Sequence, residues 1–384
     1  MKAGTLKLPR ALLLFCDYHP SLLDVLCEAL DHAGLAERIL IRKRGSTEWG
    51  DGKTRVVSLP MRVFGEGDPP SFASVLSLIA YLIMATAVGT FLVMRRRLDA
   101  IVGVFGFPQG LVAVLVGLLT RRKVAVLTDG GDIDVLLGKR LTRQLMLFSL
   151  RRANSVAALN ETKAHRLVSL GLKAKLCRIE HVNTSRFAYA PMADKEEASV
   201  LYVGRFSDEK CPEVLVKACN RLWREGVNLK LLMVGEGPLK SKIADTVAKM
   251  GMTDATVLKG GIPHSEIHRF FREASVYVLP SRREGVSVSL LEAMSSGCLC
   301  IASDIPDNRE LIQHMYNGIL FHVDDVEDLA TKVKWAISNP SEVGPMVSRA
   351  RYLVEDRYSL QAVGKTLGIL VSSLTLGDDN LGAL

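Results

Sequence analysis

The strongest constraint on the fold lies at residues 276–302, where two apolar runs flank a segment with a helical pattern. The first run ends at Pro280, a loop with one glutamate follows, and the helical segment ends at Gly297 before the second run. Strand, helix and strand within about thirty residues form a βαβ unit, and the crossover of such units is almost always right-handed. This stretch therefore predicts an α/β protein with a parallel sheet.

Apolar runs alternate with helical patterns along the whole chain, in two series. The predicted strands are 11–15, 38–41, 55–59, 99–105, 123–128, 155–159 and 176–182 in the first series, and 200–203, 229–234 and 256–258 in the second, before the unit at 276–302. Because these runs are apolar throughout, helices are expected on both faces of each sheet. A chain of 384 residues is too long for one ordinary core. The composition changes at residues 186–199, so we predict two doubly wound, Rossmann-like domains, 1–190 and 191–358, facing each other across a cleft.

The charge is uneven between the two predicted domains. The chain carries a formal net charge of +8, but residues 1–190 hold 27 Lys and Arg against 15 Asp and Glu, a net of +12. A basic first domain is expected to meet an anionic surface or substrate. No nucleic-acid-binding motif accompanies the charge, so a nucleic-acid partner is not expected.

The seven cysteines show no CxxC pair and no zinc spacing, which favours reduced thiols in a cytoplasmic protein without a cysteine-ligated metal.

A long apolar stretch raises the question of a membrane. Residues 71–94 contain no charged side chain and are followed by Arg95, Arg96 and Arg97. The length is sufficient for a spanning helix, but a span would divide a regular α/β domain between two compartments. We therefore predict a helix that lies partly in the fold and partly in the membrane interface, with its basic end on anionic head groups. The expected location is the cytoplasmic face of the cell membrane, as a peripheral protein.

Charged residues follow several predicted strands of the second series. Ligands of α/β sheets bind beyond the carboxyl ends of strands and against helix N-termini. Gly204 and Arg205 directly follow one strand, and Lys210 comes just before the next helix, so two cations could hold a diphosphate there. Ordinary solvated loop charges are the alternative for this pair.

Two glutamates occupy the loop and the helix after the strand at 276–279. Glu284 lies in the loop and faces the predicted site, whereas Glu292 lies eight positions further on the helix. Glu292 also fits a capping box with Ser289, in which it would only satisfy a backbone N–H. The segment Gly235-Glu236-Gly237 is a weak dinucleotide signal and is better interpreted as a tight turn.

The first domain offers a carboxylate pair after the strand at 123–128. Asp132 and Asp134 follow Gly130 and Gly131, and could bind a metal ion that accompanies a sugar diphosphate. Capping of the following helix explains the pair equally well.

These motifs resemble those of the family 4 retaining glycosyltransferases of the GT-B fold, also called glycosyl transferases group 1. The matching motifs are Val203-Gly204-Arg205 with Lys210, Val234-Gly235-Glu236-Gly237-Pro238, Leu279-Pro280-Ser281 with Glu284, Glu292-Ala293-Met294, Asn308-Arg309-Glu310 and, in the first half, Gly131-Asp132-Ile133. The resemblance covers essentially the whole chain and is most specific in the C-terminal half. It implies that a last helix, at about 360–374, returns to the first domain.

The resemblance also implies roles for individual residues. Glu284 would hold the hydroxyls of the donor sugar and Glu292 the ribose, while Arg205 and Lys210 would hold the diphosphate. The other substrate-binding positions that it implies are the backbone of Gly285, Val286, Ser287 and Val288, together with Gly204, Gly260, Asn308 and Asp132. Asp129 stands where many members of the family have a catalytic histidine.

The implied reaction moves a sugar from a UDP- or GDP-sugar to a lipid-linked or glycan acceptor with retention of configuration. Its transition state is oxocarbenium-like, so negative charge grows on the departing diphosphate. Cations and helix N-termini can stabilise that charge, so neither a metal nor a cofactor besides the nucleotide sugar is expected. A sugar-nucleotide epimerase with the same fold and a membrane-associated non-catalytic homologue are the alternatives.

Overall fold

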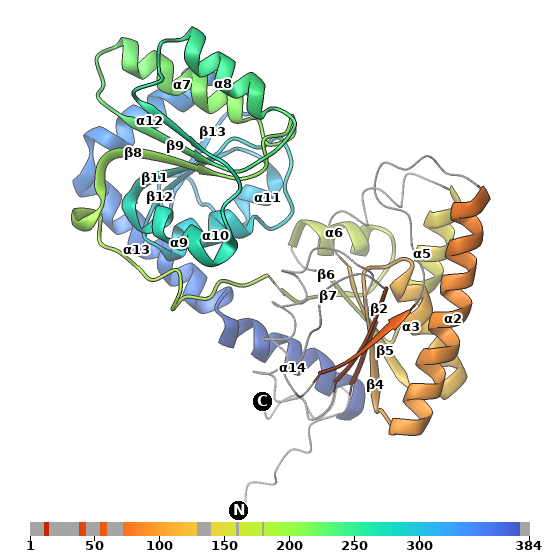
Figure 1. The fold of residues 1–384 in the computed structure, drawn as a ribbon. Helices are drawn as coiled ribbons and strands as arrows, with labels where there is room; N and C mark the ends of the chain where they lie inside the picture. Colours follow the sequence, from red (N-terminus) through yellow and green to blue (C-terminus); the bar gives the residue numbers. More distant parts are fainter. Residues whose placement is uncertain are drawn as a thin grey trace, which may run out of the picture. The chain divides into compact units, whose positions relative to one another are not determined.

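Figure 1 shows a computed structural model of the protein, which divides into two compact units. The structure describes residues 11–14, 38–43, 54–59, 72–128, 140–158, 161–178 and 180–376. Unit 1 comprises residues 1–180 and 363–384, and unit 2 comprises residues 181–362.

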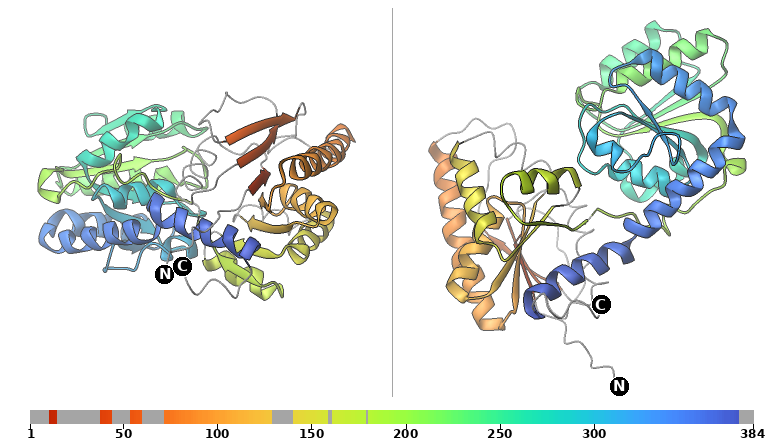
Figure 2. Two further views of the ribbon diagram at one scale, coloured as in Figure 1. Left: turned by 90° about the horizontal axis from the view of Figure 1, so that it is seen from below. Right: turned by 180° about the vertical axis from the view of Figure 1, so that it is seen from behind.

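Unit 1 contains a parallel sheet of seven strands in the part of the chain described. In sheet order they are β3 (Thr54–Leu59), β2 (Arg38–Lys43), β1 (Ala11–Leu14), β4 (Ala100–Val104), β5 (Lys123–Thr128), β6 (Ser155–Ala158) and β7 (Ala174–Leu176). The described helices are α2 (Phe72–Arg96), α3 (Gln109–Thr120), α5 (Arg140–Arg152), α6 (Glu161–Ser169) and α14 (Leu360–Leu376), which belongs to unit 1 from Val363 on. Figure 2 shows α2, α3 and α5 side by side on one face of this sheet.

Unit 2 contains a second parallel sheet, of six strands. In sheet order they are β10 (Thr256–Lys259), β9 (Lys230–Val234), β8 (Glu196–Val203), β11 (Ala274–Leu279), β12 (Leu299–Ser303) and β13 (Ile319–Phe321). Its helices are η1 (Met192–Asp194), α7 (Pro212–Arg224), α8 (Lys240–Lys249), α9 (His264–Glu273), α10 (Val288–Ser295), α11 (Pro306–Arg309), α12 (Val326–Ser338) and α13 (Pro340–Arg357).

Both faces of the unit 2 sheet are buried, which explains why its strands are apolar without alternation. Along β8, Val200 and Tyr202 pack into a core with α7, α8 and α12, while Leu201 and Val203 pack into a second core with α9, α10 and α13. Successive strand residues point to opposite faces, so a sheet covered on both sides needs apolar residues at every position. Each such buried side chain stabilises the fold by about 1.5–3 kcal/mol. The predicted fold class, two doubly wound parallel α/β domains, is confirmed.

The direction in which strands are added to the unit 2 sheet reverses at one position, between β8 and β11. From β8 the chain proceeds outward through β9 and β10, then returns to place β11 on the other side of β8. The connections after β8 and β11 therefore diverge to opposite faces, which leaves a crevice between their carboxyl ends. Unit 1 has the equivalent position between β1 and β4.

Two boundaries differ from the predictions. The units divide at residues 180 and 181, ten residues before the predicted division, because residues 182–190 bond to unit 2: Val182 N donates to Tyr358 O (2.9 Å) and Ala190 N to Ser296 O (3.2 Å). The predicted strand at 176–182 is wrong, since β7 ends at Leu176. The apolar pattern continues past that point because Cys177 and Val182 are buried outside the sheet.

Candidate functional site

The candidate site lies at the carboxyl ends of β8 and β11, where the chain order of the sheet reverses. The loops that follow these two strands are fastened to each other. Arg282 N donates to Glu209 O (2.8 Å), and Arg282 Nη1 donates to Asp208 O (3.4 Å). Arg282 Nε also donates to Asp324 Oδ2 (2.7 Å), which ties both loops to the segment after β13. The two loops therefore form one assembly at the edge of the sheet.

Lys210 and Glu284 meet in this assembly although 74 residues separate them. Lys210 Nζ lies 2.7 Å from both carboxylate oxygens of Glu284. The Glu284 side chain is only 5 % exposed, whereas the Lys210 side chain is 25 % exposed. The ammonium group therefore offsets the cost of holding a carboxylate out of water. Because Lys210 still has solvent contact, it can also reach a ligand at this edge.

Two buried tyrosines support these loops from within the fold. Tyr202 Oη donates to Arg205 O (2.8 Å), and Tyr277 Oη donates to Ser289 Oγ (2.8 Å). Burial raises the pKa of both phenols above the ordinary value, and the charge of Glu284 raises them further. Both hydroxyls therefore stay protonated and act as fixed donors.

The loop after β9 packs against the loop after β8 at two glycines. Gly204 N donates to Val234 O (3.0 Å), and Phe206 N donates to Glu236 O (2.8 Å). Gly235 has a φ of +149°, and a Cβ atom there would lie 1.9 Å from Gly204 O. Gly237 has a φ of +155° and would place its Cβ 2.4 Å from Phe206 O. The predicted tight turn is present, and its glycines let two backbones touch beside Arg205.

Arg205 has a fixed backbone and an exposed side chain. Its carbonyl also accepts a hydrogen bond from Ser207 N (3.0 Å). Within the described residues, its guanidinium forms no ion pair. Arg205 thus provides a cation with a fixed backbone and an exposed guanidinium, in the same loop as Lys210.

The N-terminus of α10 corrects one sequence interpretation. Ser287 is the N-cap, and its Oγ accepts from Leu290 N at 3.4 Å. The capping box with Ser289 is therefore wrong, because the Ser289 hydroxyl bonds instead to Tyr277 and to Ser287 Oγ (3.2 Å). Gly285, Val286, Ser287 and Val288 form the turn into this helix, where backbone N–H groups favour anions.

Glu292 does not form a capping box, and its carboxylate contacts a histidine instead. Its carboxylate, 4 % exposed, lies 2.6 Å from His264 Nε2 at the first turn of α9. Burial raises the pKa of Glu292, while the hydrogen bond and charge of His264 and the charge of Arg186 lower it. This histidine was not among the predicted site residues, and its position after Pro263 at a helix start was the only sequence signal available.

Gly260 and Asn308 are held by local contacts. A Cβ atom on Gly260 would lie 2.7 Å from Glu236 Oε1, and the same oxygen accepts from Gly261 N (3.0 Å). Asn308 is buried, and its Nδ2 donates to Ser303 O (2.9 Å). Ser303 Oγ donates in turn to Ser281 O. The Asn308 amide thus supports the loop after β11, and direct substrate contact by Gly260 or Asn308 stays a prediction.

The predicted carboxylates of the first domain, Asp129, Asp132 and Asp134, lie outside the described residues. Of the residues described, none form a group of three or more metal-ligating side chains. The metal interpretation of Asp132 and Asp134 therefore stays untested.

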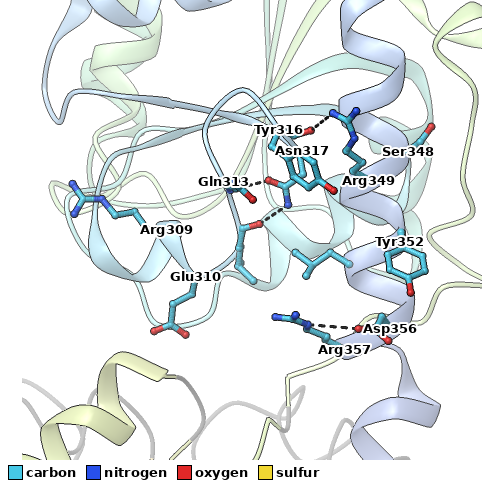
Figure 3. Close-up of a pocket in the computed structure, with 12 residues that line it drawn as sticks. Arg309, Glu310, Gln313, Tyr316, Asn317, Ser348, Arg349, Tyr352, Asp356 and Arg357 are labelled. Atoms are coloured by element: carbon cyan, nitrogen blue, oxygen red, sulfur yellow. Dashed lines mark hydrogen bonds and ion pairs between the residues drawn. The ribbon is translucent and has the colours of Figure 1, made fainter.

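A cavity of about 550 Å³ lies elsewhere in unit 2, between α13 and the segment around residues 309–317. Figure 3 shows Arg349 beside Tyr316, whose carbonyl accepts from Arg349 Nη1 at 3.1 Å, with Tyr352 on the same helix. None of the predicted site residues lines this cavity. It does not contribute to the site at the ends of β8 and β11.

Comparison with known proteins shows which folds and sequences the chain resembles. Solved structures share the fold of both units: a protein of Anabaena, solved in complex with UDP, superposes with a TM-score of 0.75 over 95 % of this chain and 100 % of that one, at 13 % identity. The chain therefore has the GT-B fold. Residues 188–352 match the family model of the glycosyl transferases group 1, which confirms the resemblance in the half that carries the Lys210–Glu284 pair.

Two relatives in sequence are named as glycosyltransferases of polysaccharide biosynthesis. The putative colanic acid biosynthesis glycosyltransferase WcaL of Escherichia coli is 25 % identical over 292 residues, which cover 72 % of this chain and 71 % of the relative. The amylovoran biosynthesis glycosyltransferase AmsK of Erwinia amylovora is 27 % identical over 224 residues, which cover 55 % of this chain and 54 % of the relative.

Proposed function

We propose that the protein is a retaining glycosyltransferase that moves a sugar from a UDP- or GDP-sugar to a lipid-linked or glycan acceptor. The observation that carries this proposal is the Lys210–Glu284 pair at the reversal point of the unit 2 sheet. A nearly buried carboxylate and a partly exposed cation at that point suit a ligand that presents both hydroxyls and phosphates.

The donor is proposed from the charges of the site. Arg205 and Lys210 provide two cations in the loop after β8, and the turn into α10 adds backbone donors. A diphosphate between them would draw Lys210 away from Glu284, whose oxygens would then accept from sugar hydroxyls. The Anabaena protein of the same fold was solved with UDP and with UDP-glucose, which supports a nucleotide-sugar donor.

The proposed reaction replaces one bond to the anomeric carbon by another. The acceptor oxygen forms a bond to this carbon as the carbon–oxygen bond to the diphosphate breaks. The acceptor proton passes to the departing phosphate oxygen, on the same face of the sugar. Arg205, Lys210 and the N-terminus of α10 stabilise the growing negative charge, so we propose that no metal ion is required.

Nucleotide binding is tested first, by thermal shift with UDP, GDP and ADP. A ligand at a hundred times its dissociation constant stabilises a protein by about 2.7 kcal/mol. For a unit of this size that corresponds to a melting temperature higher by about 5–10 °C. We expect one nucleotide to give this shift, and the same shift in EDTA. Loss of the shift in EDTA would contradict metal independence, and no shift with any of the three would contradict the proposed donor.

We further propose that unit 1 lies on the cytoplasmic face of the cell membrane through α2. Within the described residues, α2 has the length and apolar composition of a membrane span over Val75–Arg96, with 17 % of that stretch buried. Tyr81, Ala85 and Val93 on one side are buried in unit 1, so a span would remove them from its core. The opposite side exposes a row of apolar side chains, namely Leu76, Ile79, Ile83, Phe91 and Met94.

Positive charges border this exposed side. Arg95 and Arg96 end α2 and Arg97 follows it. Arg121, Arg122 and Lys123 follow the neighbouring α3, whose last turn exposes Leu118 and Leu119. Apolar side chains that enter the interface beside arginines are the pattern of peripheral binding to anionic lipids. A membrane-bound unit 1 also suits a lipid-linked acceptor.

Membrane binding is tested by flotation with lipid vesicles. We expect the chain to float with vesicles that contain phosphatidylglycerol and to lose this property in the double variant Ile83→Asp/Phe91→Asp. Tyr352→Asp, at a side chain that is 70 % exposed in unit 2, is the matched control and should float normally. Equal flotation of the double variant would contradict the interfacial role of α2.

A further inference from the structure

The contact between His264 and Glu292 gives a polar pair at the ligand-binding edge that the proposed chemistry does not explain. His264 is the first residue of α9, directly after the loop that leaves β10. Helix N-termini after strands lie at the carboxyl edge of a parallel sheet, so this imidazole marks that edge. Its side chain is 57 % exposed, while the carboxylate that it holds is 4 % exposed. The pair thus consists of a solvent-exposed imidazole on α9 and a buried carboxylate on α10.

The two oxygens of the Glu292 carboxylate are not equivalent. Oε1 lies 2.6 Å from His264 Nε2. In the described part of the chain, Oε2 has no hydrogen-bond partner. Because a carboxylate can only accept, Nε2 carries the shared proton when Glu292 is ionised. One oxygen is therefore held by the imidazole, and the other is left to accept from a ligand hydroxyl.

The imidazole itself is held in place by packing. Phe187 lies with its ring centroid 5.8 Å from that of His264 and 6.4 Å from that of His268, on the next turn of α9. Phe187 is buried and also contacts the ring of Phe271 (5.8 Å). The position of His264 is thus set by the core of unit 2.

The other charged and titratable groups around α10 do not contact the Glu292 carboxylate directly. Arg186 acts on the Glu292 carboxylate through its charge alone. On α13, Arg351 Nη1 bonds to Ser295 O (2.8 Å), at the far end of α10, and Tyr277 on β11 bonds to Ser289. Among these groups, only His264 contacts the Glu292 carboxylate directly.

We propose that His264 is a positioning residue for the donor: it orients the Glu292 carboxylate so that Oε2 accepts a hydrogen bond from a ribose hydroxyl of the nucleotide. This inference rests on the proposed nucleotide-sugar site. An ionised acceptor forms the stronger hydrogen bond, so nucleotide affinity is complete above the pKa of Glu292 and falls as the pH drops through it. Burial raises this pKa and His264 lowers it. Removal of the imidazole therefore moves the loss of affinity to higher pH.

The test is calorimetric titration with the nucleoside diphosphate, UDP, GDP or ADP, that the thermal-shift screen selects, and with its 2′,3′-dideoxy form. We expect His264→Ala to weaken binding of the ribonucleotide by about tenfold, the effect of one charge-assisted hydrogen bond. Binding of the dideoxy form should change little, because it lacks the hydroxyls concerned. In His264→Ala, the loss of affinity at acid pH should begin at a higher pH than in the wild-type chain. His264→Gln should restore part of the affinity, because its amide can also donate a hydrogen bond.

His268→Ala is the matched control, because this histidine also contacts Phe187 but has no contact with Glu292. It should leave both the affinity and its pH dependence unchanged. Equal weakening of the ribonucleotide and dideoxy forms in His264→Ala, or an unchanged pH profile, would overturn the positioning role while the proposed function stands. If the wild-type chain binds none of the three nucleotides, the proposed function fails and the inference fails with it.

Discussion

Replacing Glu284 by glutamine should lower sugar transfer by at least about a hundredfold while the protein still folds, as expected when one group that stabilises a transition state is removed. The amide keeps the size of the side chain and can still accept from Lys210, but it loses the charge that pairs with the ammonium group 2.7 Å away. Lys210→Met should have a similar effect, because it removes the cation proposed for the departing diphosphate. The measurement is transfer of labelled sugar from the nucleotide to membrane lipids.

The design separates a catalytic role from a structural one. Arg283→Ala is the matched control in the same loop, since Arg283 is 70 % exposed and pairs only loosely with Glu209 (3.8 Å). The double variant Lys210→Met/Glu284→Gln should be about as inactive as either single variant, because residues that act in one step are not additive. Full activity of both single variants would contradict the proposed site. Conversion of the nucleotide sugar to an epimer without any acceptor would favour the epimerase alternative instead.

Gly235→Ala should destabilise unit 2 by at least about 3 kcal/mol, because backbone strain and a steric clash combine. The φ of +149° disfavours any side chain, and the added Cβ would lie 1.9 Å from the carbonyl oxygen of Gly204. That oxygen belongs to the backbone of the loop that carries Arg205, so relief of the clash requires the site loops to move. Urea unfolding followed by tryptophan fluorescence is the measurement, since Trp223 and Trp335 both lie in unit 2.

Two other glycines help to separate backbone strain from steric clash in the destabilisation by Gly235→Ala. Gly226 has a φ of +83° with no atom within 4 Å of an added Cβ, so Gly226→Ala gives the cost of a side chain at a positive φ without a clash. Gly344 lies in α13, also with no atom within 4 Å, so Gly344→Ala should be neutral or stabilise by up to about 1 kcal/mol. A Gly235→Ala variant as stable as Gly226→Ala would show that the close contact with Gly204 contributes nothing.

The secondary structure was predictable where burial is uniform. In β8 and β11 every residue of the inner part is buried, so an apolar run bounded by a turn could only be a central strand. The same reasoning failed at 176–182, because Cys177 and Val182 are buried without belonging to a strand. An apolar residue reports burial, and it does not report which partner covers it.

Side-chain partners were harder to predict than elements. The helix at α10 was expected, but its N-cap is Ser287 rather than Ser289, a shift of two residues that gave Glu292 a different role. Serines two positions apart both suit a cap, and only the contact between Ser289 and Tyr277 separates them. The His264 contact with Glu292 spans 28 residues and two helices, so no local pattern could indicate it.

The loop at 280–287 could be predicted from the sequence as a ligand-binding element, because a strand, a turn and a helix occur there in order. The sequence alone also determined that Glu284, Arg205 and Lys210 each follow a strand of one parallel sheet. Which of these groups touch was decided only by the tertiary structure. The strand order places β11 directly beside β8, and this adjacency brings Lys210 to Glu284 across 74 residues of chain. Strand order depends on how whole helices pack on the two faces of the sheet, and such long-range packing leaves no local mark in the sequence.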